Sequence, residues 1–227
     1  SRPAPRSEFK RNSTGTELQR RLQRRIEAKA RGECSWCASN FPVEIPETLG
    51  LYVCYPENQA AAIAARGGGE RMCNISEGEG YSNDICAYAR TSLGIHEGKD
   101  APEQNMPLPD FVLCCNNICN CMIKWYENIS KELNIPMIMI DIPFNPDYED
   151  LMQRLIHKGS VLGCDSPAGG VHRKKWSDER FKEVMEISGR SSRAWLEATE
   201  QAKYTPSPFN GFDLLNHMAV MVTARGK

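Results

Sequence analysis

The segment from 110 to 142 most constrains the fold, because two short apolar runs flank a longer stretch of helix-forming composition. The first run is DFVLCC, the stretch ICNCMIKWYENISKELN follows Asn116 and Asn117, and the second run is PMIMIDI, which continues as Pro143 and Phe144. Parallel strands need a connection of about this length, which is usually a helix. Asparagine side chains are suited to cap that helix. The segment therefore predicts a strand, a helix and a parallel strand, and hence an α/β domain.

The other predicted elements agree with this class. Gly50 to Tyr55 has the apolar character of a strand, and the alanine-rich segment after it predicts a helix that ends at the glycines 67–69. Ser82-Asn83-Asp84 supplies capping side chains for a helix over about 85–93. We therefore expect a Rossmann-like parallel sheet with flanking helices. Further helices are predicted over 16–32, 147–158 and 178–203, with an irregular segment over 158–176.

Charge and hydropathy exclude several classes of protein. The 28 Lys and Arg residues balance 29 Asp and Glu residues, so no global charge indicates nucleic acid or a membrane surface as a partner. The longest aliphatic stretch, Met137 to Ile140, is far shorter than the roughly 18 residues of a membrane span. Residues 1–15 are expected to form a flexible arm and contain no apolar secretory segment, which predicts a cytoplasmic protein.

Ten cysteines in a cytoplasmic protein favour metal binding or packing over disulfide bonds. Cys119 is expected in the first turn of the helix that follows the 110–115 strand, and Cys86 is expected directly after a capping segment. Free amide groups and the helix dipole favour the thiolate form there, and thiolates bind metals. Two such thiolates could bind one iron–sulfur cluster, although a buried cysteine is commonly just a small hydrophobic side chain.

The remaining cysteines suggest no complete metal site. Cys34 and Cys37 have the spacing of half a zinc or redox pair, but no second CxxC or HxxxH completes it. Cys114 and Cys115 are expected to pack within a central strand, and Cys121 on another face of the helix that Cys119 begins. The four histidines show no ligand spacing.

Glu57 lies where a predicted strand gives way to a predicted helix. In open α/β sheets this edge is where ligands bind. A carboxylate there could act as a general base, or it could simply interact favourably with the helix dipole. The residues alone leave both interpretations open.

Five segments of the sequence resemble the 2-hydroxyacyl-CoA dehydratase family, most closely the alpha subunits of its (R)-2-hydroxyglutaryl-CoA enzymes. Together they cover most of residues 33–145 and the last 22 residues, far more than a short motif. The segments are GLYVCYPENQAA (50–61), GYSNDICAYARTSL (80–93), MPLPDFVLCCNNICNCMIKWYENI (106–129), NIPMIMIDIPFN (134–145) and PSPFNGFDLLNHMAVMVTARGK (206–227).

The resemblance implies a subunit of two similar α/β domains that holds a [4Fe-4S] cluster with three cysteines. Cys86 and Cys119 match the first two ligands, and the third is expected beyond this chain. Residues 16–145 would then form the N-terminal cluster-binding domain, and 146–227 a helical segment that leads into a truncated second domain. On this hypothesis the chain is the N-terminal half of a subunit.

The resemblance also implies a function. Ser39 and Glu57 match positions that face the open iron and the substrate in the family. The expected reaction is the removal of water from an (R)-2-hydroxyacyl-CoA, with 2-hydroxyglutaryl as the expected acyl group, through a ketyl radical. The implied partners are a homologous beta subunit and a separate ATP-dependent iron–sulfur activator, in an oxygen-sensitive system of amino-acid fermentation in an anaerobic host.

Three other functions stay open from the sequence. A subunit similar to benzoyl-CoA reductase would share the cluster and fold but consume electrons stoichiometrically. A non-catalytic structural or cluster-carrying partner subunit would fit the missing third ligand, and cluster content and substrate binding in the assembled complex would distinguish it. A zinc-binding α/β module would contain zinc and no iron.

Overall fold

A computed structural model describes residues 27, 28, 30, 32–98, 106–140, 175–215 and 218. The proposed arm over 1–15, most of the predicted 16–32 helix and the predicted 147–158 helix lie outside these residues, as does nearly all of 158–176. In the part of the chain that is described, no helix combines the length and apolar character that a membrane crossing requires.

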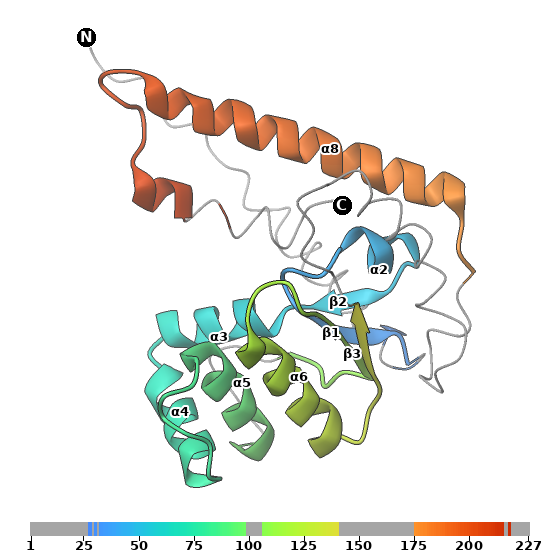
Figure 1. Ribbon diagram of the computed structural model, residues 1–227, viewed down its shortest axis with the longest axis vertical. Helices are drawn as coiled ribbons and strands as arrows, with labels where there is room; N and C mark the ends of the chain where they lie inside the picture. Colours follow the sequence, from blue (N-terminus) through green and yellow to red (C-terminus); the bar gives the residue numbers. More distant parts are fainter. Residues whose placement is uncertain are drawn as a thin grey trace, which may run out of the picture.

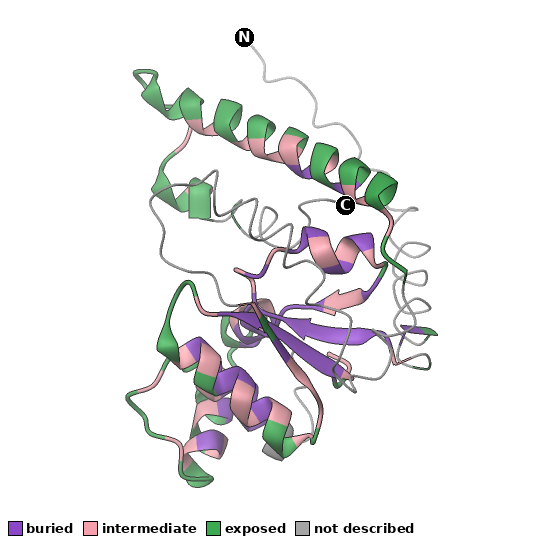
Figure 2. Cartoon of the chain, turned by 45° about the vertical axis from the view of Figure 1, so that its right-hand side comes forward, coloured by how far each residue is buried: buried purple, intermediate pink, exposed green. Residues whose placement is uncertain are grey.

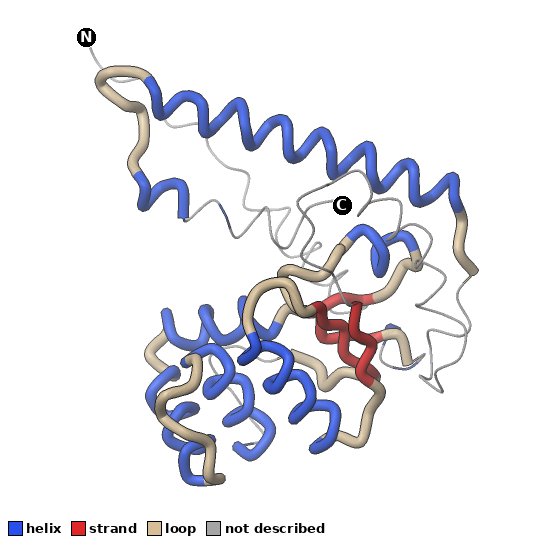
Figure 3. Tube along the Cα trace, in the orientation of Figure 1, coloured by secondary structure: helices blue, strands red, loops and turns tan. Residues whose placement is uncertain are grey.

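Four strands form one parallel sheet at the centre of the structure (Figures 1 and 3). The order in space is β2-β1-β3-β4, and Trp36 of β1 pairs with Cys54 of β2 on one side and Val112 of β3 on the other. This arrangement confirms the predicted α/β class and the crossover between β3 and β4. The strands are β1 (Cys34–Cys37), β2 (Tyr52–Cys54), β3 (Phe111–Cys115) and β4 (Met137–Ile140).

Helices lie on both sides of the sheet, with α3 to α6 on one side and α2 with α8 on the other (Figure 1). Ser188 of α8 donates a hydrogen bond to Glu44 of α2 at 2.6 Å, and both residues are buried. The helices are α2 (Glu44–Thr48), α3 (Pro56–Ala65), α4 (Gly69–Gly78), α5 (Ala87–Gly98), α6 (Asn120–Glu132) and α8 (Asp178–Glu200), followed by the short 3-10 helix η3 (Gln201–Lys203).

The helix predicted over 178–203 is confirmed as α8 and η3. Ser177 caps α8 by accepting a hydrogen bond from the backbone N–H of Arg180 at 3.1 Å. The outward face of α8 is exposed, whereas Val184 and Ser188 are buried (Figure 2).

The core lies around β1 and β3, the two central strands (Figure 2). Every residue of both strands is buried, as expected for parallel strands that helices cover on both faces. The sequence patterns did not predict β1, because its four residues are the CSWC segment that also fits half a metal pair. The largest fully buried side chains include Trp36, Phe41, Phe111, Leu113, Tyr126 and Ile129.

Gly94 allows α5 to lie directly against α4. A β-carbon at this position would lie 2.1 Å from the carbonyl oxygen and 2.9 Å from the carbonyl carbon of Met72. These are backbone atoms, so a rotamer change cannot relieve the clash. The close approach of α4 and α5 therefore requires glycine at position 94.

We expect Gly94→Ala to lower the free energy of unfolding by about 1–3 kcal/mol, as overpacking does elsewhere. Urea denaturation measures the change. Gly78→Ala in α4 is the control, because nothing lies within 4 Å of a β-carbon there and alanine favours helix. Equal stability of Gly94→Ala and the unmodified protein would contradict the close contact between α4 and α5.

Candidate functional site

Three loops meet at the carboxyl edge of the sheet. Ser39 follows β1, Glu57 lies at the start of α3 after β2, and Cys119 lies between β3 and α6. Because these three strands are parallel neighbours, their carboxyl ends open on the same side. The topology therefore gathers a hydroxyl, a carboxyl and a thiol at one edge.

Ser39 and Glu57 are in direct contact. The backbone N–H of Ser39 donates to Oε1 of Glu57 at 3.0 Å, and the Ser39 hydroxyl lies 3.4 Å from the same oxygen. On the other side, the hydroxyl of Tyr126 donates to Oε2 of Glu57 at 3.3 Å. Both carboxyl oxygens therefore have hydrogen-bond donors in an environment where the side chain of Glu57 is buried.

Burial raises the pKa of Glu57 above its ordinary value, and the hydrogen bonds from Ser39 and Tyr126 partly oppose this effect. A raised pKa brings a carboxyl group closer to the range in which it exchanges protons at neutral pH. The position of Glu57 in the first turn of α3 also agrees with the helix-dipole interpretation. The two interpretations are compatible, because the dipole stabilises the same carboxylate that can accept a proton.

The sequence patterns gave no sign of Tyr126. This residue is 69 positions from Glu57 in the chain, and in the sequence it looks like an ordinary aromatic side chain of an amphipathic helix. It is fully buried, and burial with the nearby Glu57 charge raises its pKa well above the ordinary tyrosine value. Tyr126 is therefore a neutral hydrogen-bond donor at physiological pH.

Cys86 and Cys119 occupy equivalent positions at two helices. Cys119 is the N-cap residue of α6, with extended backbone angles of φ −146° and ψ 151°, and its thiol makes no capping hydrogen bond. Cys86 immediately precedes α5, and its carbonyl accepts the N–H of Arg90 at 3.0 Å. Both cysteines are exposed. Two accessible thiols therefore lie at the starts of two helices.

The capping residues expected from the sequence are wrong in both cases. Ser82 instead accepts the N–H of Asp84 at 3.2 Å, within the turn that precedes Cys86. Asn117 accepts hydrogen bonds from Asn40 Nδ2 at 2.7 Å and from the Cys115 thiol at 3.1 Å. Asn117 thus connects the loop that carries Cys119 to the loop that carries Ser39, rather than capping α6.

Most other cysteines are buried side chains of the core. Cys34 and Cys37 are fully buried in β1, where residues three apart point to opposite faces, so they cannot bind one zinc ion together. Burial raises the pKa of Cys114 to about 12 and that of Cys115 to about 11. These thiols stay protonated at neutral pH, as expected for packing residues.

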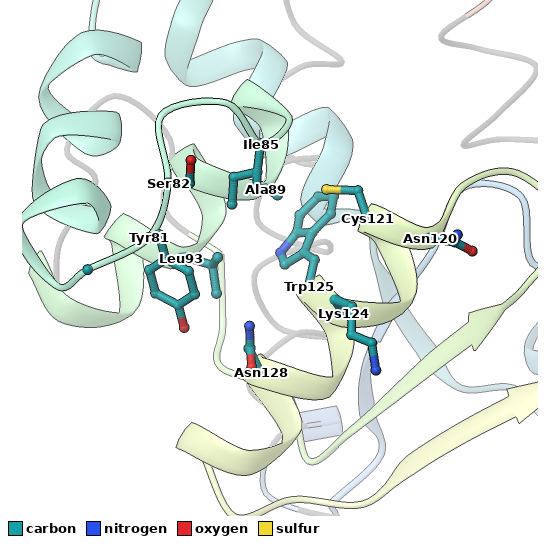
Figure 4. Close-up of a pocket in the computed structure, with 11 residues that line it drawn as sticks. Tyr81, Ser82, Ile85, Ala89, Leu93, Asn120, Cys121, Lys124, Trp125 and Asn128 are labelled. Atoms are coloured by element: carbon teal, nitrogen blue, oxygen red, sulfur yellow. The ribbon is translucent and has the colours of Figure 1, made fainter.

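The segments that carry Cys86 and Cys119 border the same pocket, which has a volume of about 380 Å³ (Figure 4). Ile85, directly before Cys86, and Cys121, shortly after Cys119, both line it. The described residues contain no group of three or more His, Cys, Asp or Glu side chains that could hold a metal ion. Cys86 and Cys119 themselves are not among the residues that line this pocket, and their role as cluster ligands stays a prediction.

We expect the raised pKa of Glu57 to appear as a pH-dependent effect of Glu57→Gln on stability. A carboxyl group whose pKa is higher in the folded state stabilises the fold fully below its ordinary pKa of 4.5 and loses this contribution as the pH rises through the raised value. Glu57→Gln should therefore become more stable, relative to the unmodified protein, as the pH increases from about 4.5 towards neutrality. Urea denaturation at a series of pH values measures this trend.

Glu127→Gln provides a control of opposite sign. The hydrogen bond from Lys124 lowers the pKa of Glu127, so its contribution is present above the ordinary pKa and is lost as the pH falls. A stability difference for Glu57→Gln that stays constant or declines with rising pH would contradict the buried, protonation-prone carboxyl group.

Comparison with known proteins identifies the family. A family model described as 2-hydroxyglutaryl-CoA dehydratase, D-component, matches residues 38–227. The (R)-phenyllactyl-CoA dehydratase alpha subunit of Clostridium sporogenes is 54% identical over 203 residues, which are 88% of this chain and 50% of that protein. The (R)-2-hydroxyisocaproyl-CoA dehydratase alpha subunit of Clostridioides difficile is 47% identical, with 89% of this chain and 50% of that protein covered.

A third relative is the (R)-2-hydroxyglutaryl-CoA dehydratase subunit alpha of Acidaminococcus fermentans, which is 37% identical over 88% of this chain and 58% of its own length. The chain thus spans about half the length of the curated relatives it matches. The resemblance seen in the sequence segments is confirmed, and the chain belongs to the 2-hydroxyglutaryl-CoA dehydratase D-component family.

Proposed function

We propose that this protein is part of an (R)-2-hydroxyacyl-CoA dehydratase, a lyase that acts as a complex. The observation that carries the proposal is the buried carboxyl group of Glu57, hydrogen-bonded to Ser39 at the same sheet edge as the exposed N-cap residue Cys119. A proton acceptor and a metal-binding thiol on neighbouring loops are the groups that this dehydration needs. The names of the relatives agree with this activity.

Cys86 and Cys119 are the proposed ligands of a [4Fe-4S] cluster. Both side chains are exposed and lie at the starts of helices, so they are accessible to a metal. When bound, a cluster with one iron free of protein thiolate would supply a Lewis acid and a one-electron carrier. The third cysteine that the family resemblance implies would come from outside the described residues.

The substrate poses a problem of polarity. The hydroxyl leaves from the carbon next to the thioester, while the proton leaves from the β-carbon, which an ordinary thioester barely acidifies. One electron added to the thioester carbonyl gives a ketyl radical anion, which can expel the α-hydroxyl as hydroxide. The enoxy radical that remains has a much more acidic β C–H bond.

Glu57 is the proposed acceptor of the β-proton. Proton loss gives the ketyl radical anion of the product, which returns its electron and leaves the enoyl-CoA. The proton and the hydroxide together account for the water that is removed, so no net electron is consumed. Ser39, which contacts Oε1 of Glu57, is the proposed residue that orients a substrate oxygen.

The proposed assembly includes a homologous beta subunit and a separate ATP-dependent iron–sulfur activator that injects the electron. The relatives are named as alpha subunits, which supports a partner subunit. We place the complex in the cytoplasm of an anaerobic organism that ferments amino acids, because oxygen would oxidise both the electron-carrying form of the enzyme and the cluster.

The acyl group is part of the proposal. The sequence segments predict 2-hydroxyglutaryl, whereas the relatives with 54% and 47% identity are named for phenyllactyl and 2-hydroxyisocaproyl groups. Both of these side chains are apolar, so we favour an apolar 2-hydroxyacyl group over 2-hydroxyglutaryl. Assaying all three CoA thioesters side by side separates these substrates.

We expect Glu57→Gln to lower kcat for dehydration by about 100-fold or more, because a positioned general base contributes about that much. The assay uses the anaerobically purified complex with its activator and the three thioesters. Glu127→Gln, which changes a partly exposed carboxylate of α6, should keep full turnover.

Each alternative predicts a different result. Full turnover by Glu57→Gln would show that Glu57 is not the base. One electron pair consumed for each product would indicate a reductase of the benzoyl-CoA type. Failure of the cluster-loaded complex to dehydrate any of the thioesters would contradict the proposed function.

A further inference from the structure

We infer that Tyr126 is a positioning residue for Glu57, because its hydroxyl fixes Oε2 of the carboxyl group while the loop after β1 fixes Oε1. The inference rests on the proposed role of Glu57 as a base. Tyr126 joins Ser39 and Glu57, the pair that the family resemblance implies. It comes from a different element, α6.

The geometry leaves the carboxyl group little freedom to rotate. The Ser39 N–H lies 3.0 Å from Oε1, and the Tyr126 hydroxyl lies 3.3 Å from Oε2. The donors come from two different elements, so a rotation of the carboxyl group would break hydrogen bonds on both sides. A base held in one orientation meets the substrate C–H bond without first having to reorganise.

Packing fixes the tyrosine ring in turn. Tyr126 has no exposed surface, and its ring centroid lies 5.3 Å from that of Trp125 at an interplanar angle of 57°. Its hydroxyl therefore cannot swing into solvent, and Glu57 is the hydrogen-bond acceptor that it reaches. An isolated phenol in such a buried position would be costly without this partner.

Several titratable groups face this pair. From β3, the Cys114 and Cys115 thiols interact with Glu57, and their pKa values lie at about 12 and about 11. From β1, the Cys37 thiol lies near Tyr126, which is itself held protonated by burial. The hydrogen bonds from Ser39, from the backbone N–H of Glu57 itself and from Tyr126 therefore stabilise the Glu57 carboxylate locally.

Removing the hydroxyl should make the carboxylate harder to form. We expect Tyr126→Phe to raise the pKa at which the base deprotonates by about one unit, because a hydrogen bond to the charged form is lost. The acid limb of the kcat–pH profile should move upward by the same amount. KM should change little, and turnover should recover at higher pH.

The test compares Tyr126→Phe and Tyr81→Phe in the anaerobic complex. Tyr81 also donates a hydrogen bond to a glutamate, Glu132, but this pair is exposed. Tyr81→Phe should therefore keep the unmodified acid limb. If Tyr126→Phe changed kcat without moving the acid limb of the pH profile, the effect would be a general structural one and would contradict the positioning role.

Infrared titration provides a readout that does not depend on turnover. The carboxyl band of Glu57 is assigned by its disappearance in Glu57→Gln, and its pKa is then measured with and without the Tyr126 hydroxyl. An unchanged pKa in Tyr126→Phe would overturn the inference. The pKa of Glu57 could instead shift in Tyr126→Phe while the complex dehydrates none of the substrates. That result would support the contact between Tyr126 and Glu57 and contradict the proposed function.

A second variant tests the same contact if the phenylalanine variant does not fold. Replacing Tyr126 by 3-fluorotyrosine keeps the ring and the hydroxyl but makes the phenol a stronger donor. The pKa of Glu57 and the acid limb should then shift downward, opposite to the phenylalanine variant. A shift upward or no shift would contradict the role of Tyr126.

Discussion

Parallel pairing of β2, β1 and β3 is the constraint on which the rest of the structure depends. It directs three loops to one sheet edge, and these loops carry Ser39, Glu57 and Cys119. The burial that stabilises such a sheet also buries the Glu57 carboxyl group, which would be costly without hydrogen bonds. The fold thus buries a carboxyl group and supplies the hydrogen-bond donors that offset the cost of burial.

Burial also separates the cysteines into two chemical classes. Thiols inside the strands, such as Cys114 and Cys115, have raised pKa values and behave as small packing side chains. Cys86 and Cys119 are exposed at the starts of α5 and α6, where backbone N–H groups favour negative charge. The same residue type is therefore buried or accessible according to where the chain places it.

Much of this could be predicted from the sequence, because periodicity and glycine positions report local structure. They predicted β3, α6 and β4, and the family resemblance identified Ser39 and Glu57, which the structure places in contact. The sequence patterns did not predict the buried β1 strand, whose cysteine spacing also fits half a metal pair. The contact of Tyr126 with Glu57 joins residues 69 positions apart in the chain, which no local pattern in a single sequence encodes.

The central claim is that Cys86 and Cys119 hold an iron–sulfur cluster beside this base, and the iron and acid-labile sulfide content of cysteine variants tests it most directly. In the anaerobically purified complex, Cys86→Ala and Cys119→Ala should each lose most of the iron and sulfide bound by this subunit. Cys121→Ala, two residues from Cys119 but only partly exposed, should retain both. Full iron and sulfide in Cys86→Ala and Cys119→Ala, or a complex that contains no iron, would contradict the account.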